Sequence, residues 1–270
     1  MPSRRALLAH AVAIAAAGGF APAARAGLPE IIEAARPSVL PIGRFDPLGS
    51  PRFAFRGTAF AVGDGRHVVT NAHVLTADGS PTGAPLVSAA NAAPGEGWAL
   101  QVPLPDGGSD WRRVELVQQD RSHDLALLRL VDGAPLAPLA LAPDGRLREG
   151  LAVLLVGFPI AGVLGFQPVS HRGMVSSIAA FALPAAIAAR LGDRAIARLR
   201  GGDFDVVQLD ATAYPGNSGG PVLDAATGEV VAVVNMVLVK GSRESALRYP
   251  SGISYAVPAR WIAPLLVKAR

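Results

Sequence analysis

Short runs of strand-forming residues separated by glycine-containing turns constrain the fold of this chain more than any other feature. Two early runs, at 57–62 and 67–70, lie on either side of the turn Gly-Asp-Gly at 63–65. Short β-rich runs bounded by such turns are typical of small all-β barrels. Further runs occupy 38–42, 111–117, 151–158, 173–178, 204–210 and 230–239. The sequence therefore predicts an all-β fold.

A stretch rich in proline and glycine divides these runs into two groups. It lies at 135–150 and predicts the crossing between an N-terminal barrel at 27–135 and a C-terminal barrel at 136–270. With 270 residues, 50% hydrophobic and 17% charged, the chain can bury one large core or two small ones. It has no cysteine, which excludes disulfides and thiol chemistry.

Residues 1–26 have the composition of an export signal. Arg4 and Arg5 precede an apolar stretch at 6–19, and Ala-Arg-Ala at 24–26 is a small-x-small cleavage site. The apolar stretch is too short to span a bilayer comfortably, so no integral membrane segment is expected after cleavage. The signal is either a twin-arginine or a general secretory one, and both predict export to the periplasm or beyond.

Removal of that signal also changes the charge of the chain. The first 26 residues hold three arginines and no acid, so the net charge falls from +4 to about +1. A surface that binds nucleic acid needs a dense positive patch, and the rest of the sequence shows none. We therefore expect no nucleic-acid partner.

The heptapeptide Pro-Gly-Asn-Ser-Gly-Gly-Pro at 215–221 presents a candidate nucleophile. Ser218 lies among glycines, between the extended runs at 204–210 and 230–239. Glycines let backbone N–H groups turn toward an oxygen that becomes negative, and we expect Gly216 and Ser218 to donate them. A simple turn is the alternative explanation, because Gly-Asn and Gly-Gly are turn dipeptides.

A serine nucleophile needs a base and a group that orients the base. His73 lies in the apolar run at 68–75, and Asp124 begins the apolar run at 124–130. Alternatively, His73 is a core histidine and Asp124 a cap or turn residue. The other histidines have no such context and are interpreted as structural: His10, His67, His123 and His171. Histidines and acids are scattered, so neither a metal site nor a cofactor is expected.

Taken together, three motifs resemble the trypsin-like serine proteases of the HtrA/Deg type. They are Thr-Asn-Ala-His-Val at 70–74, His-Asp-Leu-Ala-Leu at 123–127 and the serine heptapeptide, in the order His, Asp, Ser. A fourth match is Gly-Ile-Ser-Tyr-Ala-Val-Pro at 252–258. The resemblance implies two six-stranded antiparallel Greek-key β-barrels with the active site between them, followed by a C-terminal helix at about 259–269.

The resemblance also implies an activity and the residues that perform it. We expect a serine endopeptidase that works through an acyl-enzyme, with His73 as base, Asp124 as its orienting partner and Ser218 as nucleophile. Thr212, six residues before the nucleophile, would form the floor of the specificity pocket. Without a carboxylate there, we expect small or medium aliphatic P1 side chains. The implied substrate-binding strand contributes Val234, Asn235 and Met236.

The same resemblance bears on partners and location. It implies protein or peptide substrates, with unfolded chains as candidates, and the lack of cysteine fits a bacterial, periplasmic or secreted member. The sequence shows no PDZ domain after the protease region, so the regulation and caging of PDZ-bearing members are not expected, and the oligomeric state stays open. An alternative function is a catalytically silent protease-like domain that binds extended or unfolded polypeptides.

One segment shifts in composition, at 77–110, and another departs from that family, at 179–200. Residues 77–110 are rich in Pro, Gly, Ala, Ser and Asn and predict an elaborated surface loop near His73, with short strands at 86–88 and 98–102. It is either functional or a tolerated insertion. Residues 179–200 predict a helical insertion, with an amphipathic helix of about three to four turns after Pro184. This helix is either a lid over the cleft or an element whose arginines are simply solvated.

Overall fold

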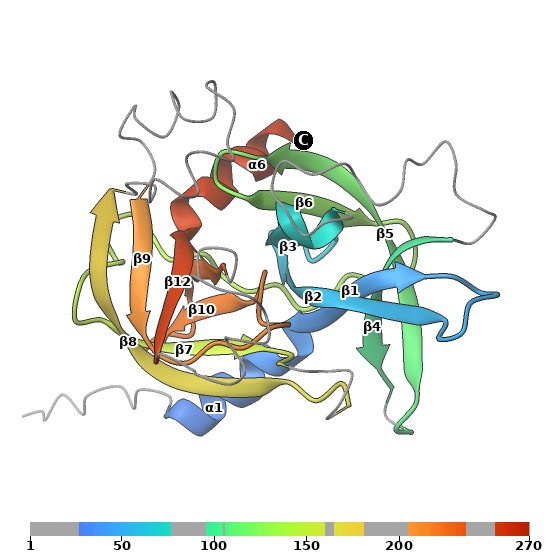
Figure 1. Cartoon of the computed structure of the whole chain (residues 1–270), viewed down its shortest axis with the longest axis horizontal. Helices are drawn as coiled ribbons and strands as arrows, with labels where there is room; N and C mark the ends of the chain where they lie inside the picture. Colours follow the sequence, from blue (N-terminus) through green and yellow to red (C-terminus); the bar gives the residue numbers. More distant parts are fainter. Residues whose placement is uncertain are drawn as a thin grey trace, which may run out of the picture.

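Two closed β-barrels lie side by side and make up most of the protein (Figure 1). The structure is a computed structural model that describes residues 27–76, 96–104, 106–159, 165–180, 205–235 and 252–269. The first barrel has the strand order β1-β2-β3-β6-β5-β4, and every neighbouring pair is antiparallel. Its strands are β1 (Val39–Phe45), β2 (Phe53–Val62), β3 (His67–Asn71), β4 (Gly97–Pro103), β5 (Ser109–Asp120) and β6 (Leu125–Leu130).

The second barrel repeats this arrangement with the strand order β10-β11-β12-β9-β8-β7. Its strands are β7 (Ala152–Gly157), β8 (Val169–Ala180), β9 (Asp205–Asp210), β10 (Pro221–Asp224), β11 (Val230–Val234) and β12 (Ile253–Pro258). All of its neighbouring pairs are also antiparallel. Two closed six-stranded antiparallel barrels confirm the fold class expected from the sequence.

Strand β6 shows why both faces of a strand can be apolar here. Successive side chains of a strand point to opposite faces. Leu125 and Leu127 join a core that the two barrels share, whereas Ala126 and Leu128 join the core inside the first barrel. All four are fully buried. The continuous apolar run after Asp124 is therefore the signature of a strand at the junction of the barrels.

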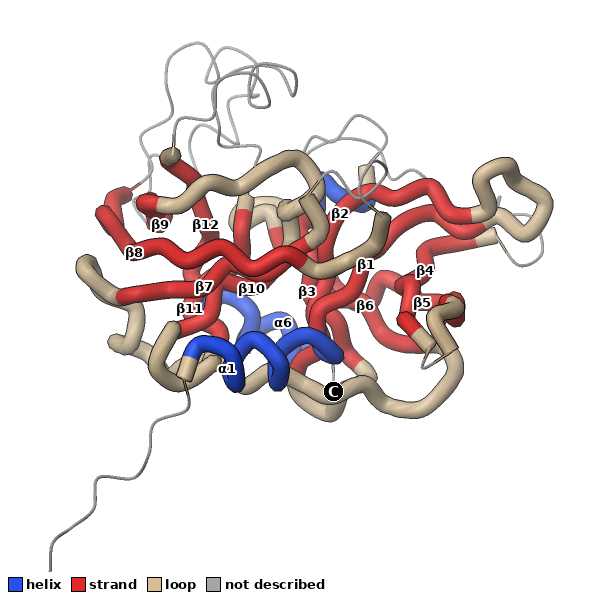
Figure 2. Tube along the Cα trace, turned by 90° about the horizontal axis from the view of Figure 1, so that it is seen from below, coloured by secondary structure: helices blue, strands red, loops and turns tan. Residues whose placement is uncertain are grey.

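Two short helices complete the shared core. Helix α1 (Leu28–Ala35) contributes Ile31 and Ala35, and helix α6 (Ile262–Lys268) contributes Ile262 and Leu265. In Figure 2 both helices lie along the lower edge of the barrels. In Figure 1 helix α6 lies near the top of the view and helix α1 near the bottom. The 3₁₀ turns η1 (Arg36–Ser38) and η5 (Ala259–Trp261) flank them, so the predicted C-terminal helix begins three residues late. Within the described residues, no helix is long and apolar enough to cross a membrane.

The segment at 77–110 is more regular than one long loop. Strand β4 occupies 97–103 and closes the first barrel by pairing with β1 and β5. Ala99 and Leu100 are fully buried on it, which explains why a segment in glycine- and proline-rich surroundings forms a barrel strand. The predicted strand at 98–102 thus exists, whereas 86–88 lies outside the described residues.

The first two residues of the predicted helical insertion at about 179–200 belong to a strand. Ala179 and Ala180 belong to β8, because the ladder to β9 continues through the pairs Ala179↔Val206 and Ala180↔Asp205. Ladder hydrogen bonds decide the conformation there, against the helical propensity of alanine. The rest of that prediction, and the predicted export signal at 1–26, lie outside the described residues.

Candidate active site

The register between β3 and β6 brings His73 and Asp124 together. Asn71, the last residue of β3, pairs with Leu125, the first residue of β6. His73 follows in the 3₁₀ turn η2 (Ala72–Leu75), and Asp124 immediately precedes β6. Because the two strands are antiparallel, the end of one lies beside the start of the other. Residues 51 positions apart therefore meet at one edge of the first barrel.

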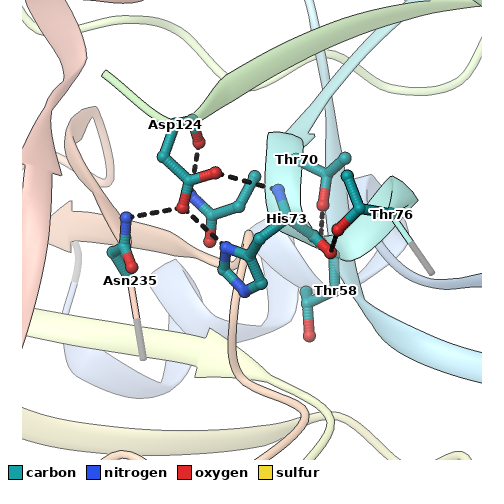
Figure 3. A network of polar contacts seen from close by, with 7 residues as sticks. Thr58, Thr70, His73, Thr76, Asp124 and Asn235 are labelled. Atoms are coloured by element: carbon teal, nitrogen blue, oxygen red, sulfur yellow. Dashed lines mark hydrogen bonds and ion pairs between the residues drawn. The ribbon is translucent and has the colours of Figure 1, made fainter. Parts of the chain in front are cut away.

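Two hydrogen bonds join the Asp124 carboxylate to His73, one to its backbone and one to its ring (Figure 3). Asp124 Oδ1 accepts the backbone N–H of His73 at 2.9 Å, and Oδ2 lies 2.6 Å from His73 Nδ1. Each residue is only 5% exposed. Because a carboxylate can only accept, Nδ1 carries the hydrogen and the neutral ring keeps Nε2 as a proton acceptor. His73 is thereby prepared to act as a general base.

Asp124 has an unusual backbone conformation, with φ at +53°. A non-glycine residue in this left-handed region is strained by about 1–2 kcal/mol. Two hydrogen bonds to its carbonyl oxygen oppose that strain, from Ala72 N at 3.1 Å and Asn71 Nδ2 at 3.0 Å. The turn is thus held by the segment that carries His73, and it directs the carboxylate toward the imidazole.

Asn235, the residue after β11, supplies a third donor to the carboxylate. Its Nδ2 donates to Asp124 Oδ2 at 2.9 Å, and its backbone N–H donates to Tyr255 O at 2.9 Å. It is 1% exposed. The sequence analysis assigned Asn235 to the substrate-binding strand and missed this contact. The available signal was an amide at the end of the otherwise apolar run Val-Val-Ala-Val-Val.

The loop with Ser218 connects β9 to β10 and is bonded to both barrels. Gly219 N donates to Val234 O at 3.0 Å, and Val234 N donates to Gly220 O at 2.9 Å. Across the interface, Thr58 N of β2 donates to Ser218 O at 2.9 Å. Ser218 itself is 7% exposed. The serine therefore lies at the junction of the barrels, fixed from each side.

Glycines allow this loop to pack against the strands that lead to His73. A Cβ atom on Gly57 would lie 2.9 Å from Ser218 O and 3.0 Å from Val74 Cγ2, so Gly57 lies between the serine and the neighbour of His73. A Cβ on Gly219 would lie 2.2 Å from Thr58 O and 3.1 Å from Asn71 N. The structure thus brings the serine loop against the end of β3, as the three sequence motifs require.

Thr58 organises the other side of the loop, a role that the sequence analysis missed. Its Oγ1 donates to Gly216 O at 2.7 Å and accepts Phe158 N–H at 3.1 Å. Gly216 has φ at +106°, which glycine adopts readily. Within the described ranges, the N–H groups of Gly216 and Ser218 donate to no protein acceptor. An oxyanion site needs two such donors beside the nucleophile.

The residues predicted to bind substrate differ in how deeply they are buried. Thr212 is half-buried, and its neighbours are held by Ser254, whose Oγ accepts Ala213 N–H at 2.8 Å and donates to Ala211 O at 2.7 Å. Val234, predicted on the substrate-binding strand, is fully buried in the core of the second barrel, so its side chain does not reach the surface. Met236 lies outside the described residues.

No set of three or more metal-binding side chains gathers within the part of the chain that the structure describes. The arrangement of an imidazole, a buried carboxylate and a hydroxyl at one junction suits acyl transfer to a serine.

Comparisons with known proteins agree with this arrangement. The sequence matches the family described as "Trypsin-like peptidase domain" over residues 57–233. It is 29% identical over 248 residues to serine protease HTRA3 of Homo sapiens, covering 88% of this chain and 44% of HTRA3. It is 28% identical over 241 residues to serine protease HTRA4 of Mus musculus, covering 87% of this chain and 39% of that protein. The chain therefore spans less than half the length of these relatives.

A solved structure shows the same fold. HtrA-type protease AlgW with tripeptide matches with a TM-score of 0.57 and 23% sequence identity, over 88% of this chain and 62% of that one.

The contact of Gly219 with the first barrel predicts that Gly219→Ala disables the nucleophile. We expect the rate at which Ser218 reacts with a fluorophosphonate to fall by about 10²-fold, because an added Cβ displaces the serine loop by roughly an ångström. Gly107→Ala is the matched control, since both glycines have φ at +84° but nothing lies within 4 Å of Gly107. Equal loss in both variants would show that backbone strain, and not the contact, decides.

The bond from Asn235 predicts that Asn235→Ala slows the reaction of Ser218. A hydrogen bond to a charged group contributes about 1.5–3 kcal/mol, so we expect a labelling rate lower by about 10- to 100-fold. Asn235→Asp should be at least as slow, because it places a second carboxylate against Asp124. Gln101→Ala, on strand β4, which pairs with neither β3 nor β6, serves as the polar control. An unchanged rate in Asn235→Ala would remove Asn235 from the site.

Proposed function

The chain belongs to the family of trypsin-like peptidase domains, and we propose that it is a serine endopeptidase that cleaves peptide bonds through an acyl-enzyme on Ser218. The observation that carries this proposal is the His73–Asp124 pair, bonded at 2.6 Å beside a serine loop that packs against the same strand end. The names of the relatives, all serine proteases, support the same reaction.

The proposed reaction uses residues of both barrels. His73 Nε2 accepts the hydroxyl proton of Ser218 as Oγ attacks the scissile carbonyl carbon, and the same nitrogen then returns the proton to the leaving amine. Asp124 stabilises the imidazolium through the bond to Nδ1. The N–H groups of Gly216 and Ser218 stabilise the negative oxygen, and one such donor contributes about 10²- to 10³-fold in kcat. Water then releases the acyl group by the same proton transfers in reverse.

The proposed substrate class rests on a solved neighbour and on the predicted specificity residue. The solved AlgW structure contains a tripeptide, which supports peptide binding by this fold. Thr212 carries no charge, so the pocket it would floor favours small or medium aliphatic P1 side chains over basic ones. The composition of residues 1–26 supports export, and we propose a periplasmic or secreted protein that meets protein substrates there.

Covalent labelling tests the proposed reaction directly. The full chain should react with a fluorophosphonate probe at one site, and Ser218→Ala should not react at all. His73→Ala and Asp124→Asn should lower peptide turnover by about 10⁴-fold or more. Ser109→Ala, an exposed serine of β5, should behave as the wild type. A folded wild-type chain that binds extended peptides but neither labels nor cleaves would instead support a silent binding domain.

The specificity proposal is tested with a peptide library that varies only P1. We expect the highest kcat/KM with Ala, Val or other small aliphatic side chains, because Thr212 offers no carboxylate to a cationic side chain. Thr212→Asp is the informative variant and should raise the relative rate for Arg and Lys. A strong preference of the wild-type chain for Arg would overturn the assignment of Thr212.

A further inference from the structure

A second histidine lies beside the catalytic pair and is held from two directions. His123 immediately precedes Asp124, and its Nδ1 lies 2.6 Å from Asp120 Oδ2. Its imidazole also stacks on the indole of Trp261, with ring centroids 3.8 Å apart and an interplanar angle of 19°. The side chain of His123 is only 12% exposed. The sequence analysis interpreted this histidine as structural.

Asp120 fixes the turn from which both His123 and Asp124 project. Its Oδ1 accepts the N–H of Ser122 at 2.9 Å and that of His123 at 3.2 Å. Burial of Asp120 raises its pKa, but the hydrogen bond and charge of His123 and the backbone N–H groups outweigh this, so the pKa lies below its usual value. Asp120 is therefore a carboxylate at neutral pH, and its bonds to the turn are lost only under acidic conditions.

Trp261 reaches this turn from the far end of the chain. It closes the turn η5, and the next residue, Ile262, begins helix α6 and is fully buried. The Arg260 guanidinium lies 5.6 Å from the indole centroid and pairs with Asp205 of β9. The indole also packs against the shared core that contains Leu125. Trp261 is thus held by other contacts besides its stack on His123.

We propose that the stack of His123 on Trp261 is a positioning contact that holds Asp124 in its left-handed conformation and so couples helix α6 to the triad. The strained φ of +53° occurs one residue after the stacked ring. A non-glycine residue keeps such a conformation only where its surroundings impose it. The carbonyl of Asp124 is held by the β3 side, and the stack holds the residue before it from the other side.

This inference rests on the proposed function for its kinetic consequence. Asp124 acts on the imidazolium of the transition state, whereas a substrate backbone would bind to the second barrel. Loosening Asp124 should therefore lower kcat and leave KM nearly unchanged. A ring pair of this kind corresponds to an effect of about 3- to 10-fold.

The kinetic experiment compares variants of the full chain. Trp261→Ala should lower kcat by about 3- to 10-fold with KM within about twofold, and Trp261→Phe, which keeps an aromatic face, should recover most of it. His123→Ala should match Trp261→Ala, and the double variant should be no slower than either single one. Val267→Ala is the control on helix α6, because its side chain is 71% exposed and lies outside the shared core, so kcat should stay unchanged.

An NMR measurement separates failure of this inference from failure of the proposed function. The His73 Nδ1 proton, bonded to Asp124, gives a low-field resonance that His73→Ala identifies, whether or not the protein cleaves peptides. We expect Trp261→Ala and His123→Ala to shift or broaden it and Val267→Ala to leave it in place. An unperturbed resonance in both ring variants, or an equal perturbation in Val267→Ala, would overturn the positioning role.

Discussion

The site depends on a buried carboxylate that receives hydrogen bonds from both barrels. Asp124 is 5% exposed and accepts N–H groups from the His73 backbone, the His73 ring and the Asn235 amide. A buried charge without such donors is strongly destabilising, so the three bonds make this position tolerable for an acid. They also fix the imidazole orientation that proton transfer requires. Because Asn235 belongs to the second barrel, the relative position of the barrels is part of the catalytic geometry.

The contact between the barrels is made by small residues and backbone groups near the serine. Gly57 and Gly219 leave no room for a side chain, and Thr58 bonds through its N–H and its hydroxyl to the serine loop. Beneath this polar layer, Leu125 and Leu127 share one apolar core with both helices. The apolar core sets how the barrels pack, and the polar layer converts that packing into the placement of Ser218 relative to β3. Stability and chemistry therefore depend on the same junction.

Much of this could be predicted from the sequence, because the strong signals are local. Short apolar runs between glycine turns indicated the barrels, and the motifs around His73, Asp124 and Ser218 indicated the reaction. What the sequence could not show depends on register between distant strands. Asn235 reaches Asp124 because it stands where β11 ends beside the first barrel. Thr58 bonds to the serine loop because β2 approaches a residue 160 positions later in the chain. His123 looked structural because its partner, Trp261, is near the other end of the chain.

A crystal structure of the chain after reaction with a peptidyl phosphonate would show directly whether the three side chains meet, since the adduct resembles the tetrahedral intermediate. We expect phosphorus bonded to Ser218 Oγ and a phosphoryl oxygen about 2.7–3.1 Å from the N–H groups of Gly216 and Ser218. His73 Nε2 should lie within hydrogen-bond reach of Oγ, with Asp124 still bonded to His73 and Asn235. An adduct on another residue, or an imidazole of His73 out of reach of the bonded serine, would contradict the proposed triad.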